Sequence, residues 1–343
     1  MAAQDLGPPP PHRTPTLWAV HDGKIGMANQ VMGLAEALGY PIIQKSLVFK
    51  APWRHLAPPF WFYPLAALSP EGALFTPPWP DIVIGCGRLV IAPCLAAKRL
   101  SGGRIFWVQI QDPRFARQKV DLMVVPEHDP ARGPNVLVTQ GAVHRVTAKV
   151  LEDARPRFQA LFASLQRPLI GVMIGGSNRA YRLTEPLLAQ LGDRLAALAR
   201  QGYGIAITAS RRTEEAGMTL LREKLAATPH FLWDGTGDNP YFGLLAHADA
   251  FIVTSDSVNM VSEAAATGKP IHIVELDGGS AKFRRFHELF KRSGITRPFT
   301  GTIEHWSYTP PDDTARAAAE IRRLMANRPH AMPLAEIPLG EIA

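Results

Sequence analysis

The sequence predicts an α/β protein made of two similar domains that face each other across a cleft. Apolar strand-like runs alternate with helical patterns along the whole chain, which is typical of parallel sheets covered by helices. The alternation runs through residues 16–150, restarts in residues 151–310, and is followed by a last helix in residues 311–343. A chain of 343 residues is long enough for two domains of ordinary size. We therefore expect two Rossmann-like halves.

Each half contains short buried strands joined by helices. In the first half the expected strands are 16–20, 42–49, 81–85, 104–110, 122–125 and 136–138, and the expected helices are 27–38 and 89–100. In the second half the expected strands are 169–174, 204–209, 231–233, 251–254 and 271–274, and the expected helices are 151–165, 184–201, 214–227, 241–246, one that opens near Asn259, and 314–326.

The composition is that of a soluble globular protein, with 46% hydrophobic and 20% charged residues. The net charge of +7 favours anionic partners, such as nucleotide phosphates or acidic lipid surfaces. The arginines are spread along the chain and no nucleic-acid-binding signature is present, so we expect no nucleic acid partner. No apolar run reaches the ~20 residues that span a bilayer.

Two features indicate a reducing, cytoplasmic compartment. Residues 1–15 contain four consecutive prolines and no apolar core, so we expect a disordered tail rather than a signal peptide. The two cysteines, Cys86 and Cys94, are too few for a disulfide framework or a four-thiolate zinc site.

The most informative stretch is residues 251–274. An apolar strand ends at Thr254, a polar turn follows, and a helix opens with Asn259 in its first turn and Glu263 one turn later. Open α/β sheets bind ligands at such strand-to-helix turns, and a helix amino end favours phosphate. A carboxylate one turn further can accept hydrogen bonds from sugar hydroxyls. This stretch predicts a nucleotide-sugar site formed by Thr254, Asp256, Ser257, Asn259, Met260 and Glu263.

Three further segments are expected beside that site. Gly175-Gly176-Ser177-Asn178 directly follows a strand, and glycines there let a backbone approach a phosphate closely. Ser210-Arg211-Arg212 ends the next strand, and two arginines beside a hydroxyl suit bidentate phosphate binding. Alternatively, the first is a tight strand-exit turn and the second a solvated charge pair. Asn239-Pro240-Tyr241 starts a helix and is also placed to contact a nucleotide base.

The first half carries a polar loop of the same kind in residues 22–30. Its glycines make it flexible at the amino end of a helix, a geometry that favours anions. Asp22 is a candidate general base, and Lys24 is a candidate to stabilise charge on a leaving phosphate. As structure alone, Asp22 would be a turn or cap residue. The candidate acceptor loop consists of Gly23, Gly26, Asn29 and Gln30.

We expect no metal and no separate cofactor. No metal-ligand spacing relates five histidines of the chain to one another, namely His21, His128, His144, His247 and His272. The sequence also has no Asp-x-Asp pair after a strand, the arrangement that binds a divalent ion together with a nucleotide. A nucleotide sugar would be a substrate rather than a cofactor.

Residues 49–65 are rich in Trp, Phe and Pro and also carry basic side chains. Aromatic residues interleaved with basic ones suit a bilayer interface. We therefore expect contact with an anionic membrane through Trp53, Phe60, Trp61 and Phe62. A proline-broken loop that covers a domain core would have the same composition.

Taken together, these motifs resemble the mitochondrial fission Elm family, which comprises a plant elongate-mitochondria factor and many bacterial relatives. The resemblance lies in Asp22-Gly23-Lys24-x-Gly26-x-x-Asn29-Gln30, Gly175-Gly176-Ser177, Ser210-Arg211-Arg212-Thr213, Asp238-Asn239-Pro240-Tyr241 and Thr254-x-Asp256-Ser257-x-Asn259-Met260-x-Ser262-Glu263-Ala264. It extends from about residue 17 to residue 306.

The resemblance implies a GT-B glycosyltransferase, similar in layout to the enzyme that makes lipid II. In such enzymes the second domain holds the nucleotide sugar, the first holds the acceptor, and the C-terminal helix crosses back onto the first domain. Many relatives carry His where this chain has Met27, so a histidine base is not carried over and Asp22 is the preferred base. The plant member is known as an adaptor that recruits a dynamin-related protein to mitochondria.

The sequence thus supports a metal-independent glycosyltransferase that moves a sugar to a membrane- or envelope-linked acceptor, such as a glycan or lipid-linked sugar, at the inner face of the cytoplasmic membrane. Two alternatives stay open. One is a non-catalytic, membrane-associated adaptor of the Elm type, and the other is a nucleotide-sugar epimerase with the same fold.

Overall fold

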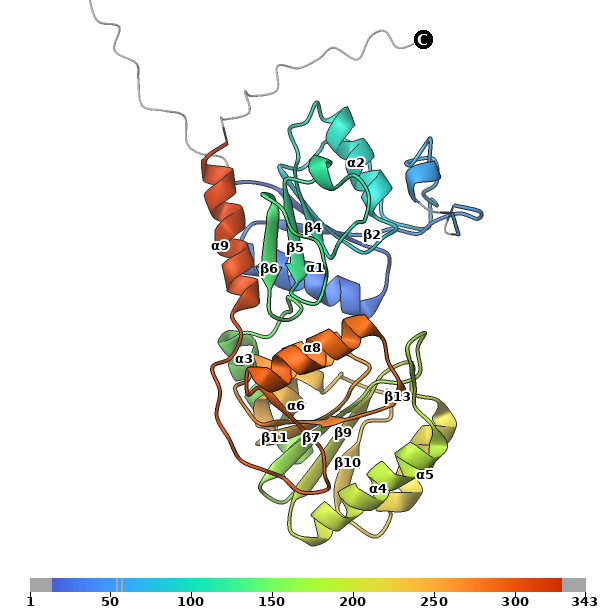
Figure 1. Ribbon diagram of the computed structural model, residues 1–343, viewed down its shortest axis with the longest axis vertical. Coiled ribbons are helices and arrows are strands. Elements are labelled where there is room, and N and C mark those ends of the chain that lie inside the picture. The colour runs from blue at the N-terminus through green and yellow to red at the C-terminus, as the bar shows by residue number, and fades with distance from the viewer. Residues whose placement is uncertain (1–13, 54, 57, 329–343) are drawn as a thin grey trace, which may run out of the picture.

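In the residues that the computed structural model describes, 14–53, 55–56 and 58–328, the protein has two α/β domains, each built on a six-stranded parallel sheet (Figure 1). The fold class predicted from the sequence is therefore confirmed. Most of the predicted disordered tail, residues 1–15, lies outside the described residues, and so does the end of the segment 311–343.

The sheet of the first domain has the strand order β2-β1-β3-β4-β5-β6. Its strands are β1 (Leu17–His21), β2 (Ile42–Ser46), β3 (Ile82–Cys86), β4 (Phe106–Ile110), β5 (Leu122–Pro126) and β6 (Val136–Thr139). Its helices are α1 (Ile25–Leu38) and α2 (Ile91–Leu100), with 3-10 turns η1 (Pro58–Phe60) and η2 (Arg117–Lys119). The strand order reverses between β1 and β3, and ligands bind open α/β sheets at such switch points.

The sheet of the second domain has the strand order β10-β9-β7-β11-β12-β14. Its strands are β7 (Leu169–Ile174), β9 (Gly204–Ala209), β10 (His230–Leu232), β11 (Ala250–Thr254), β12 (Ile271–Val274) and β14 (Thr296–Pro298), and β8 (Tyr181–Arg182) pairs with β13 (Asp277–Gly278) outside this sheet. Its helices are α3 (Ala148–Phe162), α4 (Glu185–Arg200), α5 (Glu215–Leu225), α6 (Tyr241–His247), α7 (Val258–Ala265) and α8 (Ala281–Arg292). Here the switch point lies between β7 and β11.

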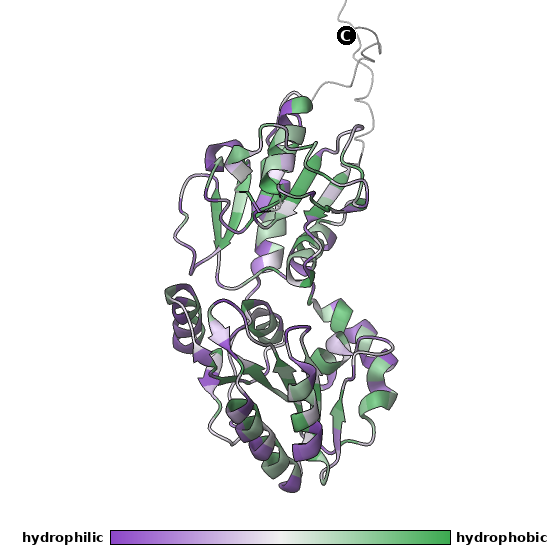
Figure 2. Ribbon diagram, turned by 90° about the vertical axis from the view of Figure 1, so that its right-hand side faces the viewer, coloured by the Kyte–Doolittle hydropathy of each residue, from purple (hydrophilic) through white to green (hydrophobic). Residues whose placement is uncertain are grey.

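Both sheets are packed on both faces, which explains why their central strands are nearly continuous apolar runs rather than alternating ones. Every residue of β1, β3, β4, β5, β7 and β11 is buried. In the second domain, Phe251 and Phe286 belong to the core on one side of the sheet, and Leu195 and Leu221 to the core on the other. Figure 2 shows the strands largely green and many outward turns of the helices purple.

Loops at the carboxyl ends of the two sheets meet each other. Lys282 at the start of α8 forms an ion pair with Asp129 after β5, at 2.7 Å. One turn later, the Arg285 guanidinium donates a hydrogen bond to the His128 carbonyl, at 3.2 Å. The carboxyl edges of the sheets, where the predicted site residues lie, therefore face one another.

The chain crosses between the domains twice, once through residues 140–147 and once on the way into α9 (Asp313–Ala326). Helix α9 packs against α1 and buries Ala317 and Ile321 in the core of the first domain. Asp313 joins the two crossings, because its carboxylate accepts hydrogen bonds from the backbone N–H groups of Gln140 (3.0 Å) and Gly141 (2.8 Å). The last helix thus follows the second domain in sequence and packs on the first domain in space.

One region differs from the expectation. The sequence patterns predict no element between residues 274 and 314, whereas the structure has β13, α8 and β14 there. Helix α8 is amphipathic and buries Phe286 and Phe290. Basic residues surround these apolar positions and lower the overall hydrophobicity of the segment, so its helical pattern is easily missed.

Candidate functional site

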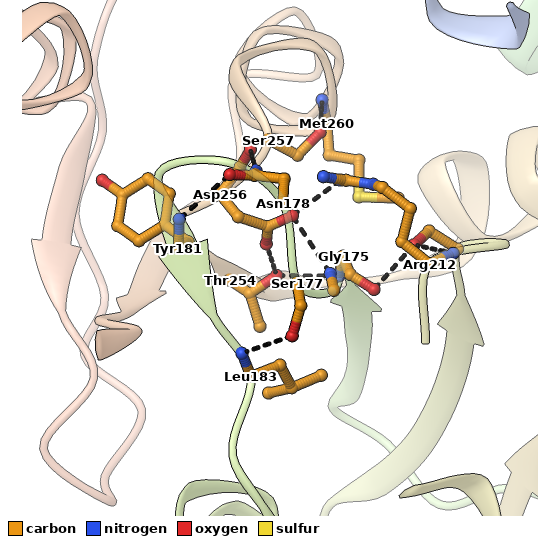
Figure 3. A network of polar contacts seen from close by, with 12 residues as sticks. Gly175, Ser177, Asn178, Tyr181, Leu183, Arg212, Thr254, Asp256, Ser257 and Met260 are labelled. Carbon is orange, nitrogen blue, oxygen red and sulfur yellow. Dashed lines mark hydrogen bonds and ion pairs between the residues drawn. The ribbon is translucent and has the colours of Figure 1, made fainter. Parts of the chain in front are cut away.

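The predicted donor residues gather at the switch point of the second domain, where β7 and β11 end side by side. The turn 175–178 follows β7, the turn 255–257 follows β11, and Ser210 follows the neighbouring strand β9. Because parallel neighbours end at the same edge of the sheet, segments distant in sequence form one polar network (Figure 3).

Asp256 lies at the centre of this network. Its carboxylate accepts hydrogen bonds from the Gly176 N–H (3.0 Å), the Thr254 hydroxyl (2.6 Å) and the Arg212 guanidinium (2.6 Å). The side chain of Asp256 has no exposed surface, whereas that of Arg212 is 40% exposed. All the contacts of this carboxylate are thus with the protein. Asp256 orients the Gly176 turn and the Arg212 side chain and does not face solvent itself.

Close approach explains the two glycines after β7. A side-chain carbon on Gly175 would collide with the Asp256 carboxylate, and one on Gly176 would collide with the backbone carbonyl of Arg212. Thr254 adds a second tether, since its hydroxyl oxygen accepts a hydrogen bond from the Gly175 N–H at 2.8 Å. The backbone N–H groups of Gly175 and Gly176 therefore hold this turn against β11. A side chain at either position would prevent so close an approach.

The two arginines after β9 have different surroundings. The hydroxyls of Ser210 and Thr213 both donate to the Gly175 carbonyl, which fixes the arginine turn beside the glycine turn. Arg212 is engaged by Asp256, as described above. Arg211 is exposed and has no ion-pair partner among the described residues, so its guanidinium is free to bind an anion.

Helix α7 begins at the same edge. The Ser257 hydroxyl caps it by accepting a hydrogen bond from the Met260 N–H, at 3.3 Å. Ser177 is exposed, and its hydroxyl accepts a hydrogen bond from the Leu183 N–H, at 3.1 Å. Asn178 closes its own turn by accepting from N–H groups two and three residues onward. A helix amino end beside an exposed hydroxyl is a geometry that suits phosphate.

Glu263 lies in the second turn of α7 and is only 4% exposed. The Tyr241 hydroxyl, from the start of α6, donates a hydrogen bond to the Glu263 Oε2 atom. Burial raises the pKa of Glu263 to about 7, and the hydrogen bond from Tyr241 opposes this shift. Asn239 is exposed and its side chain accepts from the Tyr241 N–H, at 3.0 Å. Near neutral pH, Glu263 is therefore poised between its neutral and ionised forms.

The candidate catalytic loop follows β1, at the switch point of the first domain. Asp22 forms an ion pair with Lys24, whose side chain is 64% exposed. The Oδ1 atom of Asp22 is buried and has no hydrogen-bond partner among the described residues. Burial lowers the pKa of the preceding His21, although the Asp22 charge opposes this, and its Nδ1 accepts a hydrogen bond from the Gly23 N–H at 3.1 Å. The Asp22 Oδ1 atom thus retains unused capacity to accept a hydrogen bond.

The rest of the candidate acceptor loop lies just before α1, at Gly23, and in the first turns of that helix. Gly23 has φ +80°, which favours glycine, and Asn29 is half-buried. The Asn259 amide donates a hydrogen bond to the Gly26 carbonyl (3.1 Å) and accepts one from the Gln30 amide (2.9 Å). A residue predicted to bind the donor therefore contacts two residues predicted to bind the acceptor.

Two segments at this edge are not predicted from the sequence. Gly87 follows β3 with φ +93°, and a side-chain carbon there would collide with the Met27 sulfur. Gln111 follows β4 with φ +68°, a strained conformation for a residue with a side chain. The buried Gln109 Oε1 atom lacks a hydrogen-bond partner in the described part of the chain. The polar turn that begins at Gln111, directly after an apolar strand, is the signal that would have found this segment.

The aromatic segment after β2 is divided between core and surface. Trp61 is only 4% exposed and packs against Phe49 and Trp53, with ring centroids 5.4 Å and 6.2 Å apart. The prediction that Trp61 contacts a membrane is therefore wrong, because its ring helps to close the domain core. Phe60 and Phe62 lie on the surface, at 63% and 83% exposure.

No group of three or more His, Cys, Asp or Glu side chains within the described residues is arranged to hold a metal ion. None of the helices in that part of the chain has the length and apolar character of a membrane span. Cys86 and Cys94 are buried, and burial raises the pKa of both thiols.

Comparison with known proteins gives the family. The model of the mitochondrial fission ELM1 family matches residues 25–325. The chain belongs to this family. The mitochondrial fission protein ELM1 of Arabidopsis thaliana is 35% identical over 276 residues, which covers 73% of this chain and 65% of the plant protein. The chain thus spans just under two thirds of that relative. The uncharacterized protein RP120 of Rickettsia prowazekii is 25% identical over 351 residues, covering 89% of this chain and 97% of that one.

Solved structures share the architecture of this ELM1-family chain. A UDP-GlcNAc 2-epimerase from Methanocaldococcus jannaschii, in complex with UDP-GlcNAc and UDP, has a TM-score of 0.53 at 12% identity and covers 91% of this chain and 99% of that one. A UDP-glucosyltransferase from Polygonum tinctorium has a TM-score of 0.51 at 11% identity and covers 90% of each chain. Identities this low establish the fold alone, which is the GT-B-like fold of glycosyltransferases and nucleotide-sugar epimerases.

Proposed function

We propose that this ELM1-family protein is a metal-independent glycosyltransferase that moves a sugar from a nucleoside-diphosphate sugar to a membrane- or envelope-linked acceptor. The proposal is carried by the network around Asp256, which holds a glycine turn, an arginine turn and a helix amino end at one switch point. A surface that only docks a protein partner has no need of this arrangement, whereas the arrangement suits the binding of a diphosphate.

In the proposed complex, the donor diphosphate lies against the Gly176–Ser177 turn and the amino end of α7. Arg211 supplies charge-assisted hydrogen bonds from its free guanidinium. Tyr241 occupies Oε2 of Glu263 and leaves Oε1 to accept a ribose or sugar hydroxyl. The charge of the leaving diphosphate is then balanced by protein cations and the helix end rather than by a metal ion.

The acceptor is proposed to bind the first domain, with Asp22 as the general base. Support comes from the buried Asp22 Oδ1 atom, which lacks a hydrogen-bond partner among the described residues. A positioned base of this kind contributes about 10²–10⁴-fold to a rate. Lys24, which is paired with Asp22, would face the developing negative charge on the leaving phosphate.

Contact with an anionic membrane is proposed for the outer end of the aromatic segment. Phe60, Phe62 and Tyr63 are 63%, 83% and 75% exposed, and Lys50 is exposed in the same segment. Aromatic rings beside basic side chains suit the headgroup layer of a bilayer. In this proposal Trp61 supports the segment from within the core, and the protein acts at the cytoplasmic face of the membrane.

The first test is calorimetry with UDP, GDP, ADP and CDP. We expect one of them to bind the wild-type protein, and we expect Arg211→Ala and Glu263→Ala to abolish that binding. Arg200→Ala is the matched control, because Arg200 is also exposed but ends α4 at the opposite edge of the sheet. The proposal fails if the wild-type protein binds none of the four.

The wild-type protein and the Glu263→Ala variant also distinguish the proposed glycosyltransferase from the epimerase and the adaptor. An epimerase converts a UDP-sugar with no acceptor present, so product analysis of that two-component mixture identifies one. If no nucleotide binds and Glu263→Ala leaves the cellular phenotype intact, a non-catalytic adaptor explains the protein better.

A further inference from the structure

One side chain connects the two halves of the proposed active site. The Asn259 amide donates a hydrogen bond to the Gly26 carbonyl (3.1 Å) and accepts one from the Gln30 amide (2.9 Å). Asn259 lies in the first turn of α7, and Gly26 lies in the first turn of α1. The amino ends of these helices, one in each domain, are therefore joined directly.

The local sequence makes room for this contact. A side-chain carbon on Gly26 would lie 2.5 Å from the Asn259 nitrogen, and the nearest other atom would be 3.8 Å away and also belong to Asn259. Gln30 is 5% exposed, and its Oε1 atom accepts a long hydrogen bond from the Cys86 thiol, at 3.8 Å. The contact thus continues through α1 to β3, at the switch point of the first domain.

Helix α1 also lacks a cap of its own. Its capping residue, Lys24, makes no side-chain hydrogen bond to the first turn, and that turn contains no acidic residue. Uncapped helix ends are weaker than capped ones. By contrast, α7 is capped by Ser257 within its own domain. The first turn of α1 therefore has less side-chain support within its own domain than that of α7. The Asn259 amide tethers it to the second domain through the Gly26 carbonyl and the Gln30 side chain rather than by capping its free N–H groups.

We infer that Asn259 is a positioning residue, which holds residues 22–26 of the first domain in register with the donor edge of the second. The sequence alone assigns Asn259 to the donor. In the structure, however, both the amide nitrogen and the amide oxygen of Asn259 are used by the first domain. The assignment of the two edges to acceptor and donor rests on the proposed function. The contact of Asn259 with Gly26 and Gln30 is independent of that function.

The effect of Asn259 is expected to be local. Other contacts hold the domains together, including those from Asp313 to Gln140 and Gly141 and the ion pair of Lys282 with Asp129. Loss of the Asn259 contact should therefore loosen the loop 22–26 without separating the domains. A displacement of about 1 Å at reacting groups can cost about 10²-fold in rate.

Hydrogen exchange on the full-length protein tests the positioning role without any ligand. We expect the peptide that covers residues 22–30 to exchange at least about tenfold faster in Asn259→Ala and in Gly26→Ala. Because both changes break one contact, the double variant should exchange no faster than either single variant. Asn239→Ala is the matched control, since Asn239 is exposed at the start of another helix and should alter only its own segment.

Unchanged exchange in residues 22–30 for both single variants, with unchanged melting temperatures, would overturn the inference. Additive effects in the double variant would also overturn it. Neither result depends on nucleotide binding, so the outcome is separate from that of the proposed function.

Binding and turnover then distinguish a positioning residue from a donor ligand. For the nucleoside diphosphate that calorimetry identifies, Asn259→Ala should keep the Kd within about threefold of wild type, while kcat with the corresponding nucleotide sugar falls at least about tenfold. If the Kd weakens as much as it does in Glu263→Ala, then Asn259 binds the donor and the inference is wrong.

Discussion

The two sheet edges that face each other differ in how their polar groups are paired. At the edge of the second domain, Asp256 and Thr254 use their oxygens to bind each other, the glycine turn and Arg212. At the edge of the first domain, Asp22 Oδ1 and Gln109 Oε1 are buried with no partner among the described residues. A buried unpaired polar atom costs about 1–3 kcal/mol. The carboxylate at the edge of the second domain is therefore fully paired within the protein, whereas the carboxylate at the edge of the first domain retains unused hydrogen-bonding capacity.

The largest expected effect is a loss of stability at the edge of the second domain. Asp256→Ala should lower the free energy of unfolding by about 4 kcal/mol, because it removes a buried charge that accepts three hydrogen bonds. Urea denaturation measures this, with Asp277→Ala as the control, since Asp277 is exposed in β13. A change below about 1 kcal/mol would mean that the network does not organise this edge.

The next effect is a pH dependence centred on Glu263. Its pKa in the folded protein, about 7, lies above the usual 4.5, so the ionised form is the costly one after folding. The stability that Glu263 contributes is fully present below pH 4.5 and is lost as the pH rises through 7. The difference in unfolding free energy between wild type and Glu263→Gln should therefore fall by about 3 kcal/mol across this window.

Urea denaturation over a pH series measures that difference. Glu275→Gln, at an exposed position after β12, is the control for the loss of a carboxyl group at the surface. A flat profile for Glu263→Gln would show that the carboxyl is solvated, which would weaken the contrast between the two edges.

At the edge of the first domain, the matched substitution should have little effect on stability. Asp22→Ala is expected to change the unfolding free energy by less than about 1 kcal/mol, because its partner Lys24 is 64% exposed and screened by water, and because the change also removes the buried, unpaired Oδ1 atom. Denaturation under the conditions used for Asp256→Ala makes the comparison direct. A loss as large as that of Asp256→Ala would show that both edges are structural and that the proposed contrast is wrong.

The smallest expected effect on stability is at the exposed aromatic residues. Phe62→Ser should change the unfolding free energy by less than about 0.5 kcal/mol, because the ring is 83% exposed. It should nevertheless reduce co-sedimentation with vesicles of phosphatidylglycerol. Leu100→Ser, at a position that is 63% exposed on α2, is the control. Equal vesicle binding by wild type and Phe62→Ser would contradict the proposed membrane contact.

Much of the fold can be predicted because its signals are local. The run Leu169–Ile174 is apolar throughout and is followed at once by two glycines, so a buried strand and its exit turn are evident from eight residues. Helix α8 is the counterexample. Its two buried phenylalanines lie in a segment rich in basic residues, and two of these, Lys282 and Arg285, contact residues after β5 in the first domain.

By itself, the sequence determined the α/β class, the family and the segments that carry the candidate site. Strands, polar turns and helix starts depend on residues that are close together in the sequence. Only the tertiary structure decided which of these residues face outward. It buried Asp256 and Trp61, left Arg211 free, and joined Asn259 to Gln30, which lies 229 positions earlier in the chain. Burial and pairing depend on which distant segments pack together, and no local pattern contains that information.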